Sequence, residues 1–361
     1  MAEKLKEILL TESSVNAMAE TLGHFFPDFK RKRFVALVFD EQYDRLELKA
    51  RMRHITVCLR RTLPGSYRKA LGILEKAASQ IKGFEAMCLP DFVELYGLDD
   101  WDISLGALAL FTRYSSSEFA IRPFIIKDPK RAMIFMEKLT RDKDPNVRRF
   151  ASEGCRPRLP WAMAIPPFKK DPRLILPVLE KLKDDNSEFV RRSVANNLND
   201  ISKDNAELVL DICEKWGGKS GKTDWIIKHA CRTLLKAGNT RAMLLFGFGN
   251  PENIRVDGLT LDRNRLAIGE KVQFSFSLQV DAEGEKKVRL EYAVGFVKAR
   301  AKISRKIFKI TENTFSPGEH QLTRRHSFAD MSTRKHYPGK HQIVIFVNGV
   351  EKARVELMLA G

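Results

Sequence analysis

The sequence predicts a mainly α fold, in which an α-solenoid is followed by a small β-sandwich. Apolar residues recur at spacings of three and four up to about residue 246, as they do in amphipathic helices. Beyond about residue 250 the pattern changes to an alternation of apolar and polar residues, which indicates strands. A chain of 361 residues is longer than a single core usually holds. We therefore expect two domains, residues 1–250 and residues 255–361.

An internal repeat defines the helical part. Residues 127–149 align without gaps on residues 170–192, and ten of these 23 positions are identical. The offset of 43 residues lies within the range of about 40–47 that is typical of HEAT and armadillo helix pairs. Such pairs stack into a curved array with an extended concave surface. The sequence therefore predicts a HEAT-like α-solenoid.

The starts of the repeated helices follow from capping chemistry. Asp128 and Asp171 each precede a proline, and this order suits an N-cap residue followed by the first helical position. Asp144 also precedes a proline and predicts the start of the second helix in the first copy. Each copy should therefore form two helices joined by a short acidic turn.

The C-terminal residues predict antiparallel strands. Apolar and polar side chains alternate from Val272 to Val280 and again from Val288 to Val294. Near the end of the chain, Asn348-Gly349 separates two further apolar segments, which is a strong hairpin signal. A domain of about 105 residues with several such strands is typical of an immunoglobulin-like β-sandwich.

The net charge points to a polyanionic partner. Lys and Arg number 63 against 46 Asp and Glu, which gives a formal charge of +17, and both predicted domains share the excess. Such a charge favours nucleic acid, because every neutralised phosphate releases counterions. The alternative is a basic protein without such a partner. The scattered cysteines predict no disulfide framework, and no apolar run is long enough to cross a membrane, so we expect a cytoplasmic protein of a bacterial cell.

The first copy of the repeat departs from the second at the end of its second helix. Glu153 stands where the second copy has Asn196, and Arg156, Arg158 and Trp161 follow around two prolines. A repeat normally ends in solvating polar residues and a short loop, so this set predicts a rigid functional site. Trp161 could pack in the core or serve as a stacking platform for a base or sugar.

A second candidate carboxylate lies upstream in the chain. Glu118 follows three serines at residues 115–117, where it could act as a first-turn partner of a helix dipole or as a functional group. Pro123 lies too far along for the first position of that helix, so it should bend or end it.

Cations recur at matching positions of successive repeats and predict a ladder that follows a phosphate backbone. The alternative is a solvated helix face whose arginines form salt bridges with Asp142 and Asp185. The residues of this predicted ladder are Arg148, Arg149, Arg191, Arg192 and Lys228.

A loop before one C-terminal strand combines charge with a ring that could stack on a base. Arg334, Lys335, His336 and Tyr337 lie next to a Pro-Gly turn and predict a nucleic-acid contact, unless the loop is exposed without a role. His336 and His341 lack a carboxylate or cysteine to complete a metal site, so we expect no metal. Motifs of nucleotide-binding, zinc-protease and serine-hydrolase sites are also absent.

Four strings together resemble a known family of repair enzymes, the AlkC branch of the AlkC/AlkD DNA glycosylases. Three of them belong to the helical part, and the fourth is similar to the immunoglobulin-like domain that some AlkC proteins append. The resemblance covers essentially the whole chain. The strings are SSEFAIRPFI, RRFASEGCRPRLPW, VRRSVANNLNDISK and STRKHYPGKHQI.

This resemblance implies an enzyme that excises cationic alkylated bases, of the 3-methyladenine and 3-methylcytosine type, from double-stranded DNA. It implies a monomer that needs no metal or cofactor and does not enclose the base in a deep pocket. By motif position the catalytic roles fall on Glu118, Glu153 and Trp161, flanked by Arg149 and Arg156. Arg156 and Arg158 are expected to contact the neighbouring phosphates of the DNA. Two competing hypotheses are a HEAT-repeat protein that binds branched or damaged nucleic acid without chemistry and a protein-binding scaffold.

Overall fold

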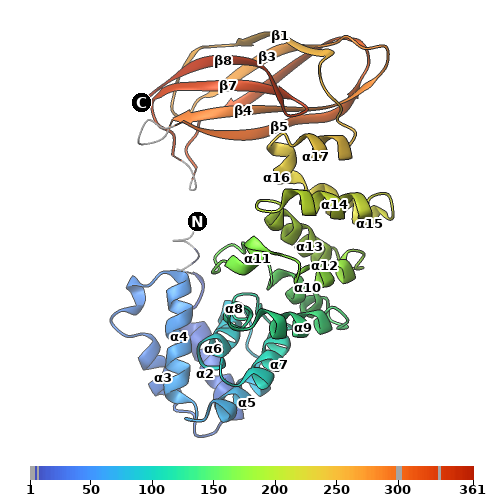
Figure 1. Cartoon of the computed structure of the whole chain (residues 1–361). Coiled ribbons are helices and arrows are strands. Elements are labelled where there is room, and N and C mark those ends of the chain that lie inside the picture. The colour runs from blue at the N-terminus through green and yellow to red at the C-terminus, as the bar shows by residue number, and fades with distance from the viewer. Residues whose placement is uncertain (1–4, 6–7, 298–302, 332–334) are drawn as a thin grey trace. The chain divides into compact units, whose positions relative to one another are not determined.

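The computed structural model of the protein describes residue 5 and residues 8–297, 303–331 and 335–361. The chain separates into two compact units, Met1–Ala230 and Cys231–Gly361. The first unit is helical, and the second contains all the described strands (Figure 1). The division lies before the sequence boundary near residue 250, because two short helices cluster with the strands.

The helices of the first unit follow one another along the chain with short connections. Among the described residues, two short 3-10 helices, Tyr43–Arg45 and Phe84–Met87, interrupt them. The α-helices are α2 (Glu12–Phe25), α3 (Arg31–Val38), α4 (Leu48–Thr62), α5 (Tyr67–Ala77), α6 (Cys88–Tyr96), α7 (Trp101–Phe111), α8 (Arg122–Lys127), α9 (Pro129–Leu139), α10 (Pro145–Glu153), α11 (Pro166–Lys170), α12 (Leu176–Leu182), α13 (Glu188–Ile201), α14 (Ala206–Trp216) and α15 (Gly221–Ala230).

The repeat predicted from the sequence is confirmed as two helix pairs, α9 with α10 and α12 with α13. The second helices of the pairs stack, since α10 packs against α13 and α13 packs against α15. Phe150 and Val190 are among the residues completely buried in this stack. The array thus places the ends of α10 and α13 next to each other.

Two predicted helix starts are confirmed and one is wrong. Asp128 accepts a hydrogen bond from the backbone N–H of Arg131, and Asp144 accepts one from that of Asn146, so both are N-caps. Asp171 does not begin a helix, because α12 starts only at Leu176. Its carboxylate instead binds the guanidinium of Arg173 at 2.5 Å, and residues 173–175 form a turn.

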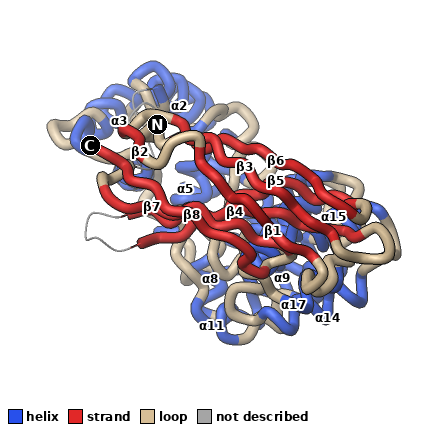
Figure 2. Tube along the Cα trace, turned by 90° about the horizontal axis from the view of Figure 1, so that it is seen from above, coloured by secondary structure: helices blue, strands red, loops and turns tan. Residues whose placement is uncertain are grey.

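The second unit begins with two short helices, α16 (Arg232–Lys236) and α17 (Thr240–Leu245), and continues as a β-sandwich. Its three-stranded sheet has the order β1-β3-β6, and its five-stranded sheet has the order β2-β8-β7-β4-β5 (Figure 2). Their strands are β1 (Ile254–Leu261), β2 (Arg265–Ala267), β3 (Lys271–Val280), β4 (Lys286–Val297), β5 (Ile303–Phe315), β6 (Gly318–Ser327), β7 (Gly339–Val347) and β8 (Val350–Ala360).

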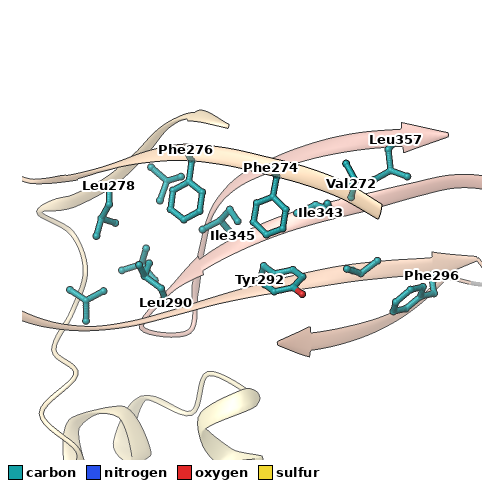
Figure 3. Packing of buried hydrophobic residues seen from close by; sticks show 14 of the residues in the cluster. Val272, Phe274, Phe276, Leu278, Leu290, Tyr292, Phe296, Ile343, Ile345 and Leu357 are labelled. Carbon is teal, nitrogen blue, oxygen red and sulfur yellow. The ribbon is translucent and has the colours of Figure 1, made fainter. Parts of the chain in front are cut away.

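The apolar face predicted by the alternating pattern fills the space between the sheets. Phe274 and Phe276 of β3 point from one sheet toward Leu290 and Tyr292 of β4 and Ile345 of β7 in the other (Figure 3). The polar residues between them on β3 are only half-buried. Burial of one face of each sheet is the driving force for an immunoglobulin-like sandwich, and the predicted fold class is confirmed.

The Asn348-Gly349 hairpin is confirmed between β7 and β8, and both residues have positive φ angles, 47° and 80°. The turn lies directly against Gly238, which follows α16. A Cβ atom added to Gly349 would lie 2.5 Å from the Cα of Gly238. The Asn348 side chain also donates a hydrogen bond to the carbonyl of Gly249 at 2.8 Å. These contacts attach the helix-containing segment of this unit to the sandwich.

No helix among the described residues has the length and apolar character that a membrane crossing requires.

Candidate active site

Glu153 lies in the last turn of α10 and is only 5% exposed. Its Oε1 accepts a hydrogen bond of 2.6 Å from Nη1 of Arg156. Its Oε2 accepts one of 2.7 Å from the hydroxyl of Ser193 on α13, which in turn accepts from Ser152 at 2.6 Å. The predicted carboxylate is therefore held in place by its own repeat on one side and by the next repeat on the other.

Arg156 joins this carboxylate to a second one. Its Nε and Nη2 each lie 2.8 Å from Oδ2 of Asp200, near the end of α13. Burial alone would lower the pKa of Arg156, but Glu153 and Asp200 raise it above its usual value. The guanidinium of Arg156 is thus buried and bound on both sides, where it orients Glu153. Its contact with DNA stays a prediction.

Arg149 connects the two predicted glutamates. One guanidinium nitrogen lies 3.4 Å from Oε1 of Glu118, and another lies 3.5 Å from Oε1 of Glu153. The same guanidinium covers the ring of Phe189, with 4.7 Å between its carbon and the ring centroid. The structure thus brings Glu118 and Glu153, the two candidate glutamates of the sequence, to one cluster.

Glu118 belongs to a turn and not to a helix. The expectation that Pro123 ends a helix is wrong, because α8 begins at Arg122 and the proline occupies its first turn. Since residues 115–121 form turns and bends, the first-turn role for Glu118 does not apply. Its Oε2 is buried and, among the described residues, has no hydrogen-bond partner.

Sequence reasoning missed Arg122, which secures the loop after α10. Its side chain is completely buried and donates from Nη1 to the carbonyls of Gly154 and Arg156, at 3.1 and 2.9 Å. Its Nε donates to the carbonyl of Met163 at 2.5 Å. Burial lowers the pKa of Arg122 to about 10, so the group stays charged at neutral pH. The available signal was a single cation inside an otherwise apolar run.

Trp161 projects from this loop and does not pack in the core. It is 70% exposed and has a φ angle of +63°, a left-handed conformation that is unfavourable for a bulky residue. Its carbonyl accepts a hydrogen bond of 2.8 Å from Nζ of Lys49 on α4. Trp161 and Glu118 line the same cavity, which has a volume of about 290 Å³. An exposed, strained tryptophan fits the stacking platform better than the core alternative.

The predicted cation ladder divides into structural and exposed members. Arg148 binds Asp185 of the next repeat, with its Nε 2.6 Å from Oδ2, which confirms the salt-bridge alternative at this position. Arg191 donates from Nη1 to the carbonyls of Asp185 and Asn186, at 2.7 and 2.9 Å. These two arginines thus connect turns of the array, and their contact with DNA stays a prediction.

The remaining cations lie at the surface. Arg192 is exposed and forms an i,i+4 pair with Glu188 at 2.5 Å, and Arg158 pairs with Asp204 at 2.7 Å. Lys228 is exposed on α15. Exposed pairs of this kind exchange partners at little cost, so these side chains can turn toward a phosphate.

The predicted loop of the sandwich is only partly a surface feature. Lys335 is exposed and Tyr337 is half-buried, whereas Arg334 lies outside the described residues. The ring of His336 is buried against Phe296 and Phe328, and its Nδ1 lies 3.1 Å from Asp330. The ring thus anchors the loop to the core, and the contact of His336 with DNA stays a prediction.

The cluster can stabilise positive charge without a metal. Two carboxylates share Arg149, and one of them is fixed by Arg156 and Ser193. Within the described ranges, no group of three or more His, Cys, Asp or Glu side chains could hold a metal ion. Fixed carboxylates beside an exposed tryptophan at the end of a helical repeat define a HEAT-like repeat protein with an enzyme-like site.

Comparisons with known proteins agree with this class. Residues 115–234 match the family described as "DNA alkylation repair enzyme", and residues 255–361 match the family described as "Uncharacterised protein YhaZ, C-terminal Ig-like domain". The chain is 45% identical to the uncharacterized protein YhaZ of Bacillus subtilis over 98% of this chain and 99% of the relative. It is also similar to the Pseudomonas fluorescens alkylpurine DNA glycosylase AlkC, solved bound to DNA containing an abasic site analogue.

That similarity extends over 99% of each chain, with a TM-score of 0.94 and 36% identity. The chain therefore belongs to the family of DNA alkylation repair enzymes, in the AlkC branch that carries a C-terminal immunoglobulin-like domain.

Proposed function

We propose that this protein is a DNA glycosylase of base-excision repair that hydrolyses the N-glycosidic bond of cationic alkylated bases, of the 3-methyladenine and 3-methylcytosine type, in duplex DNA. The observation that carries the proposal is the pair of buried glutamates, Glu118 and Glu153, held together by Arg149 beside the exposed Trp161. The similarity to AlkC over the whole chain supports the same activity.

The chemistry suits a site with carboxylates and no strong general acid. When the bond between C1′ and the base nitrogen breaks, its electron pair leaves with the base and neutralises the cation. The sugar becomes oxocarbenium-like, as in the hydrolysis of other glycosides. A fixed carboxylate stabilises this positive charge, and a carboxylate oxygen takes the proton of the water that adds to C1′.

Glu153 is suited to the electrostatic part, because both of its oxygens are held by hydrogen bonds and cannot reorient away from the sugar. Glu118 supplies a second carboxylate with one oxygen that no described residue engages. Trp161 would stack on the exposed nucleotide, so the base need not enter a deep pocket.

DNA binding would use cations of both units. The half-buried Arg149 and Arg158 and the exposed Arg192 and Lys228 would offer positive charge to phosphates near the site, and Lys335 with Tyr337 would offer a contact from the sandwich. Bending the duplex costs a few kcal/mol and is easiest where alkylation has already weakened a base pair, which adds selectivity for lesions. We propose that the enzyme acts as a cytoplasmic monomer without a cofactor.

The test is single-turnover release of N3-methyladenine from methylated duplex DNA by the wild type and by Glu153→Gln. We expect release by the wild type and a loss of most of the rate in the variant, with DNA affinity retained. Glu137→Gln, at a half-buried position of the same repeat where the carboxylate pairs with Lys181, is the matched control.

Release at the normal rate by Glu153→Gln would move the chemistry to another carboxylate, and Glu118→Gln would then be measured. Tight binding to duplex DNA without any release by the wild type would replace the glycosylase with a protein that binds damaged or branched DNA.

A further inference from the structure

A cavity of about 290 Å³ opens beside the proposed site in the helical unit. Its volume is at the lower end of ligand pockets, which range over about 300–1,000 Å³, so it suits a small group and not a nucleotide. Its walls come from segments far apart in the sequence. The residues that matter here are Met52, Phe84, Met87, Phe119, Trp161 and Glu118.

The lining has the composition of a cage for a methylated cation. Aromatic faces attract cations through the ring quadrupole, and thioethers are soft groups that adapt to apolar substituents. Phe84 and Phe119 are half-buried, and Trp161 is exposed, so their rings are accessible from solvent. Lys49 also lines the cavity, and its Nζ lies 5.1 Å from the centroid of Phe119, so one cation already lies over that ring.

A carboxylate lies in the same wall. Glu118 directs Oε1 toward Arg149 at 3.4 Å, while its Oε2 is buried with no hydrogen-bond partner among the described residues. A buried acceptor without a partner is unfavourable unless a ligand satisfies or neutralises it. The combination of accessible rings, thioethers and this oxygen suits a positively charged and partly apolar ligand.

We propose that this cavity, which we name the methyl cage, reads the alkylated, cationic edge of the damaged base. The N-alkyl group enters between the rings and the thioethers, and Glu118 faces the positive charge, while the rest of the base stays outside. A neutral base lacks both the charge and the methyl group and gains little from the cage. This inference rests on the proposed function, because it assigns the substrate edge read at that same site.

The cage also gives Phe119 and Met87 a role in specificity that differs from catalysis. They lie beside the carboxylate cluster but bind the substrate edge and not the sugar. Changing them should therefore alter the preference between alkylated and normal bases more than it alters DNA binding.

The test measures binding of a sugar-free probe to the full-length protein by ligand-detected NMR titration. The probe is 3,9-dimethyladeninium, a permanent cation in which a methyl group replaces the sugar, and its neutral comparison is 9-methyladenine. We expect the cation to bind at least about 10-fold more tightly, in line with a desolvated cation–π contact supported by a carboxylate. Tetramethylammonium serves as a third probe and should bind more weakly than the adeninium.

Phe119→Leu keeps an apolar side chain but removes the ring, so we expect it to reduce the preference for the cation about 3- to 10-fold. Met87→Trp fills the cavity and should abolish binding of the probe, which provides a second variant if the first fails to fold. Phe26→Leu, at a half-buried ring outside the cavity, is the matched control and should keep the wild-type preference.

Equal affinity for the two purines in a protein that releases N3-methyladenine would overturn the cage and leave the glycosylase intact. Equal affinity for tetramethylammonium and the adeninium would overturn the assignment to a base. A clear preference for the adeninium in a protein that releases nothing would keep the cage as a binding site and reject the proposed activity. Absence of both binding and release would reject both.

Discussion

Two successive copies of one repeat have different tasks in this protein. The first copy ends α10 with Glu153, whereas the second copy has Asn196 at the corresponding position of α13. The second copy instead provides Ser193 and Asp200, which bind Glu153 and Arg156 of the first. The carboxylate site is thus formed between two copies, and neither copy contains it alone.

The comparison shows how a stacked array can acquire a site without changing its fold. The helices of the two copies align and share their core positions, so the scaffold is the same. A few polar residues at one helix end differ, and their partners lie on the neighbouring helix. The following predictions test this division, from the largest expected effect to the smallest.

The largest effect should come from giving the first copy the residue of the second. Glu153→Asn removes the fixed negative charge beside the sugar, and we expect excision to fall by about 10³-fold, within the range for loss of a positioned catalytic group. Single-turnover release measures the rate, and a filter-binding titration should show unchanged DNA affinity. A variant that keeps more than a tenth of the activity would contradict the assigned difference between the copies.

Removal of the buried arginine should cost stability as well as rate. Arg156→Ala leaves Asp200 buried without its main partner, so we expect a loss of about 3–5 kcal/mol in the free energy of unfolding. Arg158→Ala removes an exposed pair with Asp204 and should cost less than about 1 kcal/mol. Urea denaturation of the two variants measures their free energies of unfolding. Equal losses would contradict the expectation that the Arg156–Asp200 pair stabilises the contact between the two copies.

The support that the second copy gives to the loop of the first can be tested at Asn197. Its Nδ2 donates a hydrogen bond of 2.8 Å to the carbonyl of Ser152 and lies 3.4 Å from Sγ of Cys155. Asn197→Ala leaves that carbonyl without this donor, and we expect a loss of about 1–2 kcal/mol in unfolding free energy. Thermal unfolding measures this change, and excision should fall less than in Glu153→Asn. A larger fall in excision would make Asn197 part of the chemistry.

The smallest expected effect is a change in the salt dependence of DNA binding. It distinguishes an exposed arginine of the predicted ladder from one that is bound within the array. Arg192→Ala removes an exposed charge, so we expect the slope of log affinity against log salt to decrease in magnitude by about one. Arg148→Ala should leave this slope unchanged, because its guanidinium is bound to Asp185. DNA titrations at several salt concentrations measure both slopes, and a reduced slope for Arg148→Ala would return it to the phosphate interface.

Local patterns allowed much of this structure to be predicted. The period of the apolar residues, the internal repeat and the Asn348-Gly349 turn depend on neighbours in the sequence, and all three led to the correct elements. Glu118 and Glu153 also meet as predicted, through Arg149. The predicted helix start at Asp171 in the second copy was wrong. An Asp-Pro pair is compatible with a turn as well as with a helix start, and α12 begins only after such a turn.

The partners of the charged residues could not be predicted, because they depend on how one repeat stacks on the next. Arg156 finds Asp200 on the neighbouring helix, 44 residues further along, and sequence alone does not tell a buried guanidinium from one that faces DNA. His336 is similar, since its ring lies in an aromatic cluster that forms only when the sandwich closes.

The contact between Gly238 and Gly349 has a consequence for how this chain can be divided. Neither position has room for a side chain, because the backbones of the segment after α16 and of the β7–β8 turn are in direct contact. A fragment that starts at residue 255 would lack Gly238 and would therefore lose its contact with the β7–β8 turn. A fragment intended to fold by itself should therefore begin near residue 231 and include the two short helices α16 and α17.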